Sequence, residues 1–294
     1  SFTPLYSGYM GVAKVDNIFI RCSDFGINTS QDVLFYDHTI GLRDTVPSNT
    51  VPSTTKDESL SPSNFIQTQR RIWRPSPISI SGSFSFPAAT LENEPLTSGL
   101  EAIFGHAKYG TYFDIEFQYY CGIGRKFTDC RVNSFEFMIS AGDIITINTS
   151  MFAKNVEDVD PSEFSHTKTE KLVTWDKVGI SFTNVGNGTT VSASEHMSEL
   201  SFSINNNLSN IYTSNPRSGM DNLLPRDIRV GMQEVSGSVT FYLLKGKDNI
   251  STSLDDPQRI GITVPGGTIN IDVVFMPRDI SGSISPIITE IPFI

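Results

Sequence analysis

The sequence predicts a mainly β protein, and three observations support this fold class. Apolar and polar residues alternate in many short segments, which is typical of strands with one buried face. Helical periodicity is confined to one stretch. Of the 294 residues only 18% are charged while 11% are aromatic, a balance that argues against a disordered chain.

The clearest strand is expected over Ile78–Phe86, where Ile, Ser and Phe alternate almost without interruption. Gly, Pro, Asn and Asp fill the spacers between the alternating segments, as expected of turns. The same period of two predicts strands over Asp16–Cys22, Tyr112–Tyr120, Arg131–Ile139, Asp143–Phe152, Leu172–Thr183, Glu199–Asn205, Val235–Leu244, Arg259–Val264 and Thr268–Met276.

One helix is expected within 88–104, where leucines and Phe104 recur at roughly helical spacing. Because Pro95 is tolerated only in the first turn of a helix, the helix proper is predicted near 95–104. Gly105 is the expected C-terminal cap.

Two segments are predicted to be loops. Residues 44–64 hold three prolines and many Ser and Thr, and this length favours a mobile arm or an interaction loop. Residues 154–171 are rich in charge and favour an interdomain linker. The predicted domains are therefore 1–165, with the long loop and the helix, and a shorter one over 166–294.

An internal repeat supports this division. Ile80–Phe86 matches Val235–Phe241 around a shared Ser-Gly-Ser, and Gly142–Asn148 matches Gly266–Asp272 further along. The order of the matched segments is the same in both halves. The sequence therefore predicts a duplicated β domain.

Charge and hydropathy exclude several classes of function. The formal net charge is −10, so a broad nucleic-acid-binding face is not expected. No apolar run approaches the roughly 18 residues that a membrane-spanning helix needs, so no membrane anchor is expected. The N-terminus shows neither a basic nor an apolar signal region, and secretion is not expected.

No pattern of catalytic or metal-binding residues is found. The four histidines lie far from other ligand types, and His38 and His106 are expected in turns or on the surface. Neither a nucleophile elbow nor a phosphate-binding loop is present. We therefore expect no enzyme activity, no cofactor and no metal.

The cysteines and one basic cluster leave alternatives open. Cys22, Cys121 and Cys130 are expected to be reduced, although a Cys121–Cys130 disulfide would form if the two lay on adjacent strands. Arg70, Arg71 and Arg74 surround a tryptophan and suit either base stacking or salt bridges to an acidic neighbouring subunit. The negative net charge favours the neighbouring subunit.

Two segments carry a resemblance to a known family. Pro225–Phe241, with its Ser-Gly-Ser strand, resembles the central strands of bacteriophage tail tube proteins, and Arg71–Phe86 with the following helix and strands is similar to the same fold. The resemblance implies two tandem tail-tube-type β-sandwich or barrel domains with one flanking helix.

The same resemblance implies a structural virion protein, assembled in the host cytoplasm. Its partners would be further copies of itself, in stacked rings of three-fold or six-fold symmetry, with the tape measure protein and the genomic DNA in the lumen. Sheath, baseplate and tail terminator proteins are further expected neighbours. On this basis Lys56, Asp57 and Glu58, at the tip of the long loop, are expected at the contact between rings, with the three arginines at a subunit interface.

Two alternatives stay open. A baseplate hub or tube initiator would have the same domains but would stop at one ring. A β-sandwich binding module of the virion would need an exposed aromatic platform or a calcium-type cluster of Asp residues. Trp73 and Trp175 are isolated in alternating segments and are expected in the core or at an edge.

Overall fold

The structure is a computed structural model that describes residues 11–16, 18–22, 24–38, 70–87, 89–91, 97–119, 124–159, 170–192, 197–214, 222–242, 257–264, 267–273 and 288–293. Within these ranges most residues lie in β-strands, and α1 (Thr97–Tyr109) is the one α-helix. The predicted mainly β class with a flanking helix is therefore confirmed.

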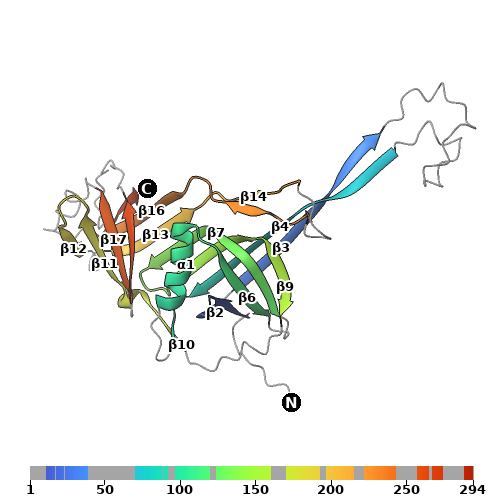
Figure 1. The fold of residues 1–294 in the computed structure, drawn as a ribbon. Helices are drawn as coiled ribbons and strands as arrows, with labels where there is room; N and C mark the ends of the chain where they lie inside the picture. Colours follow the sequence, from blue (N-terminus) through green and yellow to red (C-terminus); the bar gives the residue numbers. More distant parts are fainter. Residues whose placement is uncertain are drawn as a thin grey trace, which may run out of the picture.

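An antiparallel sheet, called the main sheet below, runs through the whole molecule (Figure 1). Seven strands follow one another across this sheet, each paired with the next. In spatial order they are β3 (Asp24–His38), β4 (Arg70–Pro87), β8 (Thr146–Ala153), β7 (Gly124–Ser140), β13 (Met197–Asn205), β16 (Glu234–Tyr242) and β19 (Ile288–Phe293).

Smaller groups of strands complete the fold. The first part of β7 leaves the main sheet and pairs with β6 and β9, and β6 continues to β1 and β2. A four-stranded sheet has the order β12-β11-β17-β18, and two short pairs are β10-β5 and β14-β15. The bounds are β1 (Gly11–Val15), β2 (Ile18–Cys22), β5 (Ala89–Leu91), β6 (Phe113–Tyr119), β9 (Asn155–Val159), β10 (Glu170–Leu172), β11 (Gly179–Asn184), β12 (Thr190–Ser192), β14 (Ser209–Ile211), β15 (Asp227–Arg229), β17 (Gln258–Val264) and β18 (Gly267–Val273).

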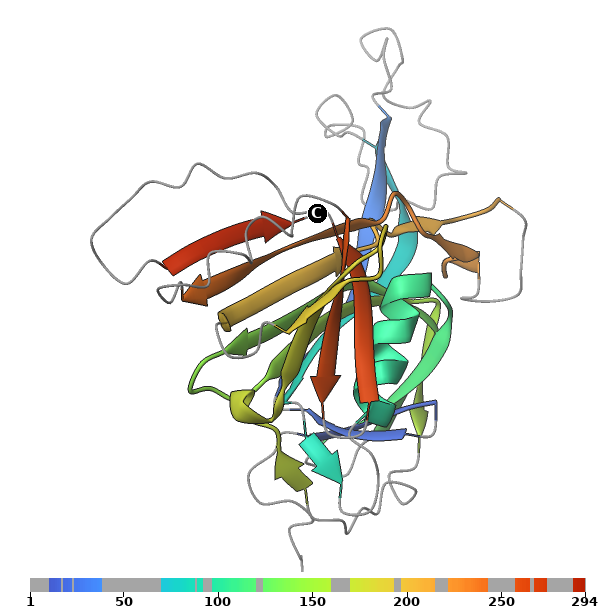
Figure 2. The same cartoon turned by 90° about the vertical axis from the view of Figure 1, so that its left-hand side faces the viewer.

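One hydrophobic core joins these layers, and aromatic rings are prominent in it. Phe104 of α1 meets Phe135 of β7 and Phe202 of β13 edge-on, with ring centroids 5.7 and 6.3 Å away. Phe137 stacks on Phe202 at 5.2 Å. Because alternate residues of a strand face the same side, these rings place α1 on the apolar face of the main sheet (Figure 2).

The helix ends later than predicted, so the assignment of Gly105 as the cap is wrong. Ala107 continues the buried stripe of Leu100, Ile103 and Phe104, and its burial carries the helix past Gly105 to Tyr109. Gly110 has the left-handed φ of 59° that ends a helix, a conformation that glycine adopts without a steric penalty.

Several strands differ from the sequence-based expectation. β3 has an irregular pattern with a register shift between Gln31 and Val33, and it was not predicted. Residues 155–159 of the expected linker form β9, although their charged sequence resembles a loop, because they pair with residues 124–128 of β7 and Val156 packs against the core. The strand expected over Leu172–Thr183 is broken by the 3-10 helix η4 (Trp175–Lys177).

The predicted domain boundary near residue 165 stays a prediction, as does the duplication. Strands on both sides of that boundary share the main sheet, since β7 pairs directly with β13. The matched segments in β4 and β8 pair with each other, whereas those in β16 and β18 have different neighbours, β18 pairing with β17.

Candidate assembly interface

The face of the main sheet that points away from the core is polar and rich in hydroxyl groups. Its residues alternate along each strand with the buried apolar ones, so the register aligns them in rows across the sheet. One row is Ser236, Ser203, Glu136, Asn148 and Ser85, and the next is Glu234, Asn205, Ser134, Ser150 and Ser83.

The hydroxyl groups in these rows bond to one another. The Oγ atoms of Ser134 and Ser150 lie 2.6 Å apart, and those of Ser203 and Ser236 lie 3.2 Å apart. Ser85 Oγ donates to Asn148 Oδ1 at 2.6 Å. The two rows contain no Lys or Arg, and their charges are acidic. In these two rows the face, called the polar face below, is therefore rich in hydroxyl groups and weakly acidic. Met138, aligned with Ser201 and Thr146 in a neighbouring row, is an exposed apolar exception.

The main sheet ends in two strands that have only one partner each among the described strands. β3 pairs with β4 alone, and β19 pairs with β16 alone. On β3, Asn28, Thr29, Ser30 and Gln31 are exposed. An uncovered edge presents unpaired N–H and C=O groups and is a template for another strand.

β3 and β4 pair along most of their length, and the outer end of this pair, 33–38 with 70–75, is called the arm below and leaves the body of the molecule (Figure 1). Arg70, Arg71 and Arg74 lie on its β4 strand, at register positions opposite His38, Asp37 and Leu34. The structure thus brings the three predicted arginines together on one projecting element. His38 lies within β3 rather than in the predicted turn, because the strand continues through the bulge. Lys56, Asp57 and Glu58 lie outside the described residues.

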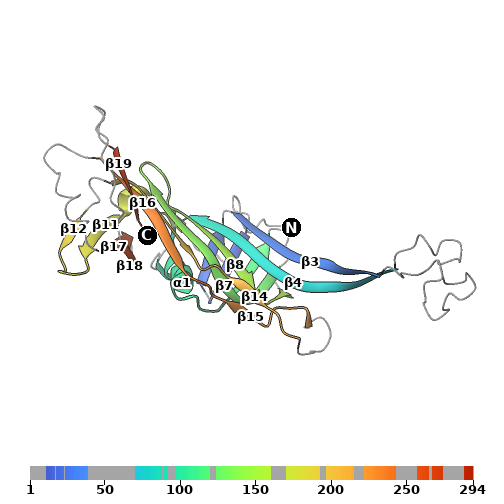
Figure 3. The same cartoon turned by 90° about the horizontal axis from the view of Figure 1, so that it is seen from above.

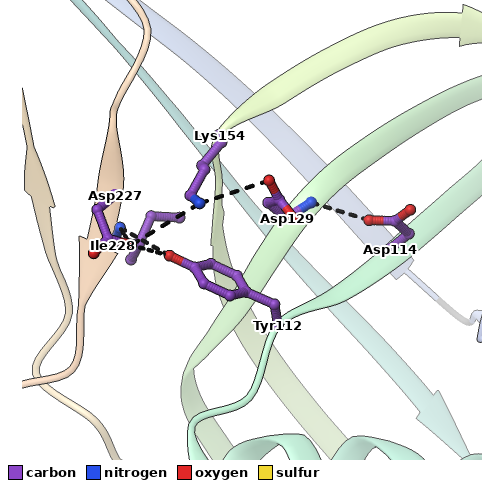
Figure 4. Close-up of polar contacts among 6 residues, drawn as sticks. All are labelled: Tyr112, Asp114, Asp129, Lys154, Asp227 and Ile228. Atoms are coloured by element: carbon purple, nitrogen blue, oxygen red, sulfur yellow. Dashed lines mark hydrogen bonds and ion pairs between the residues drawn. The ribbon is translucent and has the colours of Figure 1, made fainter.

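A polar cluster fastens β15 to the body (Figure 4). The Tyr112 hydroxyl donates to Asp227 Oδ1, and Ile228 N–H donates to the Tyr112 hydroxyl at 3.2 Å. Lys154 Nζ lies 3.9 Å from Asp227 and 3.6 Å from Asp129. The pKa of Asp227 lies below its ordinary value, mainly because its carboxylate accepts the hydrogen bond from the Tyr112 hydroxyl.

Two cations lie on the ring of Tyr112 in this cluster. The Arg131 guanidinium carbon is 3.9 Å and the Lys154 ammonium 4.1 Å from the ring centroid. Sequence reasoning missed this cluster because Tyr112 and Asp227 are 115 residues apart and share no motif.

Two further candidate residues, His106 and Cys130, lie among the described residues. His106 lies 2.5 Å from Asp16 and 2.7 Å from Thr111, and its ring stacks on Phe113. Burial raises the pKa of the Cys130 thiol well above its ordinary value, and Cys121 lies outside the described residues. In the part of the chain that the structure describes, no group of three His, Cys, Asp or Glu side chains could hold a metal ion.

Trp175 differs from its prediction. It lies in η4 rather than in a strand and is 45% exposed, so it belongs neither to the core nor to a sheet edge. The cause is local, since Lys177 and Val178 N–H groups bond back to Thr174 and Trp175 and form a tight turn there.

A main sheet whose end strands each have one partner among the described strands, together with a polar face and a projecting arm, is an architecture that suits a structural protein. The sequence pattern of the phage tail tube protein family matches residues 24–294, nearly the whole chain. The chain belongs to this family, and it is therefore a structural component of the virion rather than an enzyme. No curated protein gives a significant match. None of the described helices is long and apolar enough to cross a membrane.

Proposed function

We propose that the chain is the repeating subunit of the tail tube, and that copies close into rings whose main sheets join edge to edge. The observation that carries this proposal is that β3 and β19, on opposite sides of the main sheet, each have a single partner among the described strands. A strand edge on each side of the sheet suits a heterologous contact, because β3 of one copy can pair with β19 of the next. This contact repeats from copy to copy until the ring is complete.

In such a ring the polar faces line the lumen. The apolar face is already covered by α1 and the smaller sheets, so only the polar face remains for a hydrated channel. Its serine rows and carboxylates offer few attachments to phosphate, since phosphate binding depends on Lys and Arg. The tape measure protein and then the genomic DNA would occupy this lumen and pass without being held.

The arm supports stacking of rings. It leaves the body far from the core, which suits a contact with a neighbouring ring rather than a closed surface (Figure 1). The segment between β3 and β4 carries Lys56, Asp57 and Glu58, which we propose at the contact between rings, with Arg70, Arg71 and Arg74 facing an acidic neighbouring subunit. Sheath, baseplate and tail terminator proteins would meet the outside and the ends of such a tube.

Negative-stain electron microscopy of the purified chain across a concentration series tests this function. Hollow tubes or stacked rings with three-fold or six-fold end views are expected. Single closed rings that never stack would instead identify a baseplate hub or tube initiator. Monomers at every concentration, also after addition of preformed baseplates, would contradict both.

A further inference from the structure

The pairing of β3 with β4 changes at the point where the arm begins. Gln31 pairs with Ile78, and the next pair is Val33 with Pro75, so two residues of β4 lie opposite a single residue of β3. This two-against-one count is a β-bulge, which bends the strand that carries the extra residue and increases its local twist. The direction of the arm relative to the body is therefore decided at this bulge.

β3 by itself holds the bulge weakly. The two bulged residues of β4 are Ser76 and Pro77, and Pro75 precedes them. Proline has no N–H, so residues 75–77 together offer one backbone donor, that of Ser76. The Ser76 carbonyl accepts from a side chain of β3, the amide of Gln31, at 3.1 Å. A bulge with so few donors leaves the arm to be fixed by other contacts.

The other side of β4 supplies those contacts. β8 ends before the bulge, where its Ala153 pairs with Ile80. Two residues further on, Ile78 N–H donates to the Leu223 carbonyl at 2.7 Å, and the Tyr212 hydroxyl donates to the Ile78 carbonyl at 2.9 Å. Because the N–H and C=O of one strand residue point to the same side, the segment that joins β13 to β16 takes the place of β8 here.

This segment is called the brace below, and its described part is 208–214 and 222–229. Figures 1 and 3 show β14, part of the brace, close to the point where the arm leaves the body. Asn210 Nδ2 of β14 donates to Ser79 Oγ of β4 at 3.4 Å. At its other end, the buried Ile228 of β15 donates its N–H to the Tyr112 hydroxyl in the polar cluster. The brace is thus fixed both to the body and to the base of the arm.

We propose that the brace sets the direction of the arm by holding Ile78 from the side opposite β3. With the brace detached, the arm is free to swing about the bulge. An arm with one fixed direction loses less conformational entropy on meeting any partner than a freely hinged one. The inference concerns the single chain, so it goes beyond the proposed function and does not depend on the formation of tubes.

Distances between two spin labels, measured by pulsed electron paramagnetic resonance, test the direction of the arm. One label is placed on Asp37→Cys in the arm and the other on Glu136→Cys in the middle of the main sheet. Cys121→Ser removes a third reactive thiol, whereas Cys22 and Cys130 are buried and stay unlabelled. In the parent chain, at concentrations too low for rings to form, a single narrow distribution of distances is expected.

The double variant Asn210→Ala, Tyr212→Phe removes the side-chain hydrogen bonds of the brace to β4. Hydrogen exchange of the Ile78 amide should become at least roughly tenfold faster, because its bond to Leu223 then opens more often. The distribution of distances should widen at the same time. The matched control is Tyr109→Phe, which removes a 72% exposed hydroxyl-bearing ring's hydroxyl at the end of α1 and should change neither measurement.

Three results would overturn the brace. A broad distribution in the parent would show that the arm has no fixed direction. Faster exchange of Ile78 with an unchanged distribution would show that the direction is set elsewhere. No change in either measurement would show that Asn210 and Tyr212 do not hold Ile78. Each of these results leaves the tube function intact, because ring formation is measured separately.

Discussion

The side-chain amide of Asn206 donates to the carbonyl of Ala107 at 2.9 Å and so ties the end of β13 to the last turn of α1. Asn206 is fully buried, and the same nitrogen donates to Val132 at 2.8 Å. Its oxygen accepts from Gln233 Nε2 at 2.8 Å, and Gln233 also donates to Lys108. The last carbonyls of a helix lack donors within the helix, and the side-chain amides of Asn206 and Gln233 provide hydrogen bonds to those of Ala107 and Lys108.

Asn206→Ala is therefore expected to lower the free energy of unfolding by about 2–3 kcal/mol, because it removes the two buried hydrogen bonds to the carbonyls of Ala107 and Val132 and the one accepted from Gln233. Urea unfolding followed by circular dichroism measures this. The control is Ser236→Ala on the polar face, which should stay within about 0.5 kcal/mol of the parent. Equal losses in both variants would refute the anchoring role.

Two glycines of the helix region should respond in opposite directions. Gly105→Ala is expected to stabilise the protein by about 0.5–1 kcal/mol, because Gly105 is helical and a Cβ there meets nothing within 4 Å. Gly110→Ala should destabilise it by about 1–2 kcal/mol, since φ is 59° and the new Cβ would lie 2.9 Å from Val230. Thermal unfolding of both variants checks the pair, and a shift of the same sign in both would contradict it.

The Tyr112–Asp227 contact predicts a pH dependence. A carboxylate whose folded pKa is depressed contributes stability above its ordinary pKa and loses it as pH falls through the folded value. Tyr112→Phe should raise the pKa of Asp227 and lower the stability at pH 7 by less than about 1 kcal/mol, because this carboxylate is half exposed. As the pH falls, the difference in the free energy of unfolding between Tyr112→Phe and the parent should become smaller.

Carboxyl chemical shifts in an NMR titration report the pKa of Asp227, and unfolding at pH 7 and pH 3 reports the stability. Tyr109→Phe serves as the control, since Tyr109 is 72% exposed at the end of α1. An unchanged Asp227 titration in Tyr112→Phe would show that the hydrogen bond does not set this pKa.

The side of β3 that pairs with no other described strand gives a test of ring closure. Successive N–H groups of a strand point in opposite directions, so of Asn28 and Thr29 one donates toward β4 and the other toward the open side. Proline removes the donor. Asn28→Pro and Thr29→Pro are the two variants. The variant that loses the N–H donor toward β4 should destabilise the monomer, which thermal unfolding measures. The variant that loses the donor on the other side should stay folded but form no rings, which negative-stain microscopy shows. Normal rings from both variants would argue against joining through β3.

The proposed lumen predicts an effect of charge on DNA passage. Glu136 is exposed in the middle of the polar face, and Glu136→Lys should slow genome ejection from assembled phage because lysine attracts phosphate. The delay should shrink at higher salt, since screening weakens the attraction. Glu136→Gln, which removes charge without reversing it, is the comparison. Ejection rates that match in all three forms would exclude a lumen position for Glu136.

The sequence determined the local structure wherever one face of a strand is buried. Alternation alone placed the strands over Ile78–Phe86 and Glu199–Asn205, because a period of two leaves a strand one apolar face. It also located the helix, but not its end. The buried Ala107 that carries the helix past Gly105 is defined by contacts with β13, and those contacts are not local.

Only the tertiary structure decided which strands pair and which side chains meet. The serines of β4, β7, β13 and β16 become one polar face because the register aligns them, and the register depends on pairing between residues far apart in the chain. Ile144 and Thr174, on separate segments of the chain, are likewise brought together as a bridge. A period of two specifies that a strand forms, whereas its neighbours are selected by the packing of the whole core.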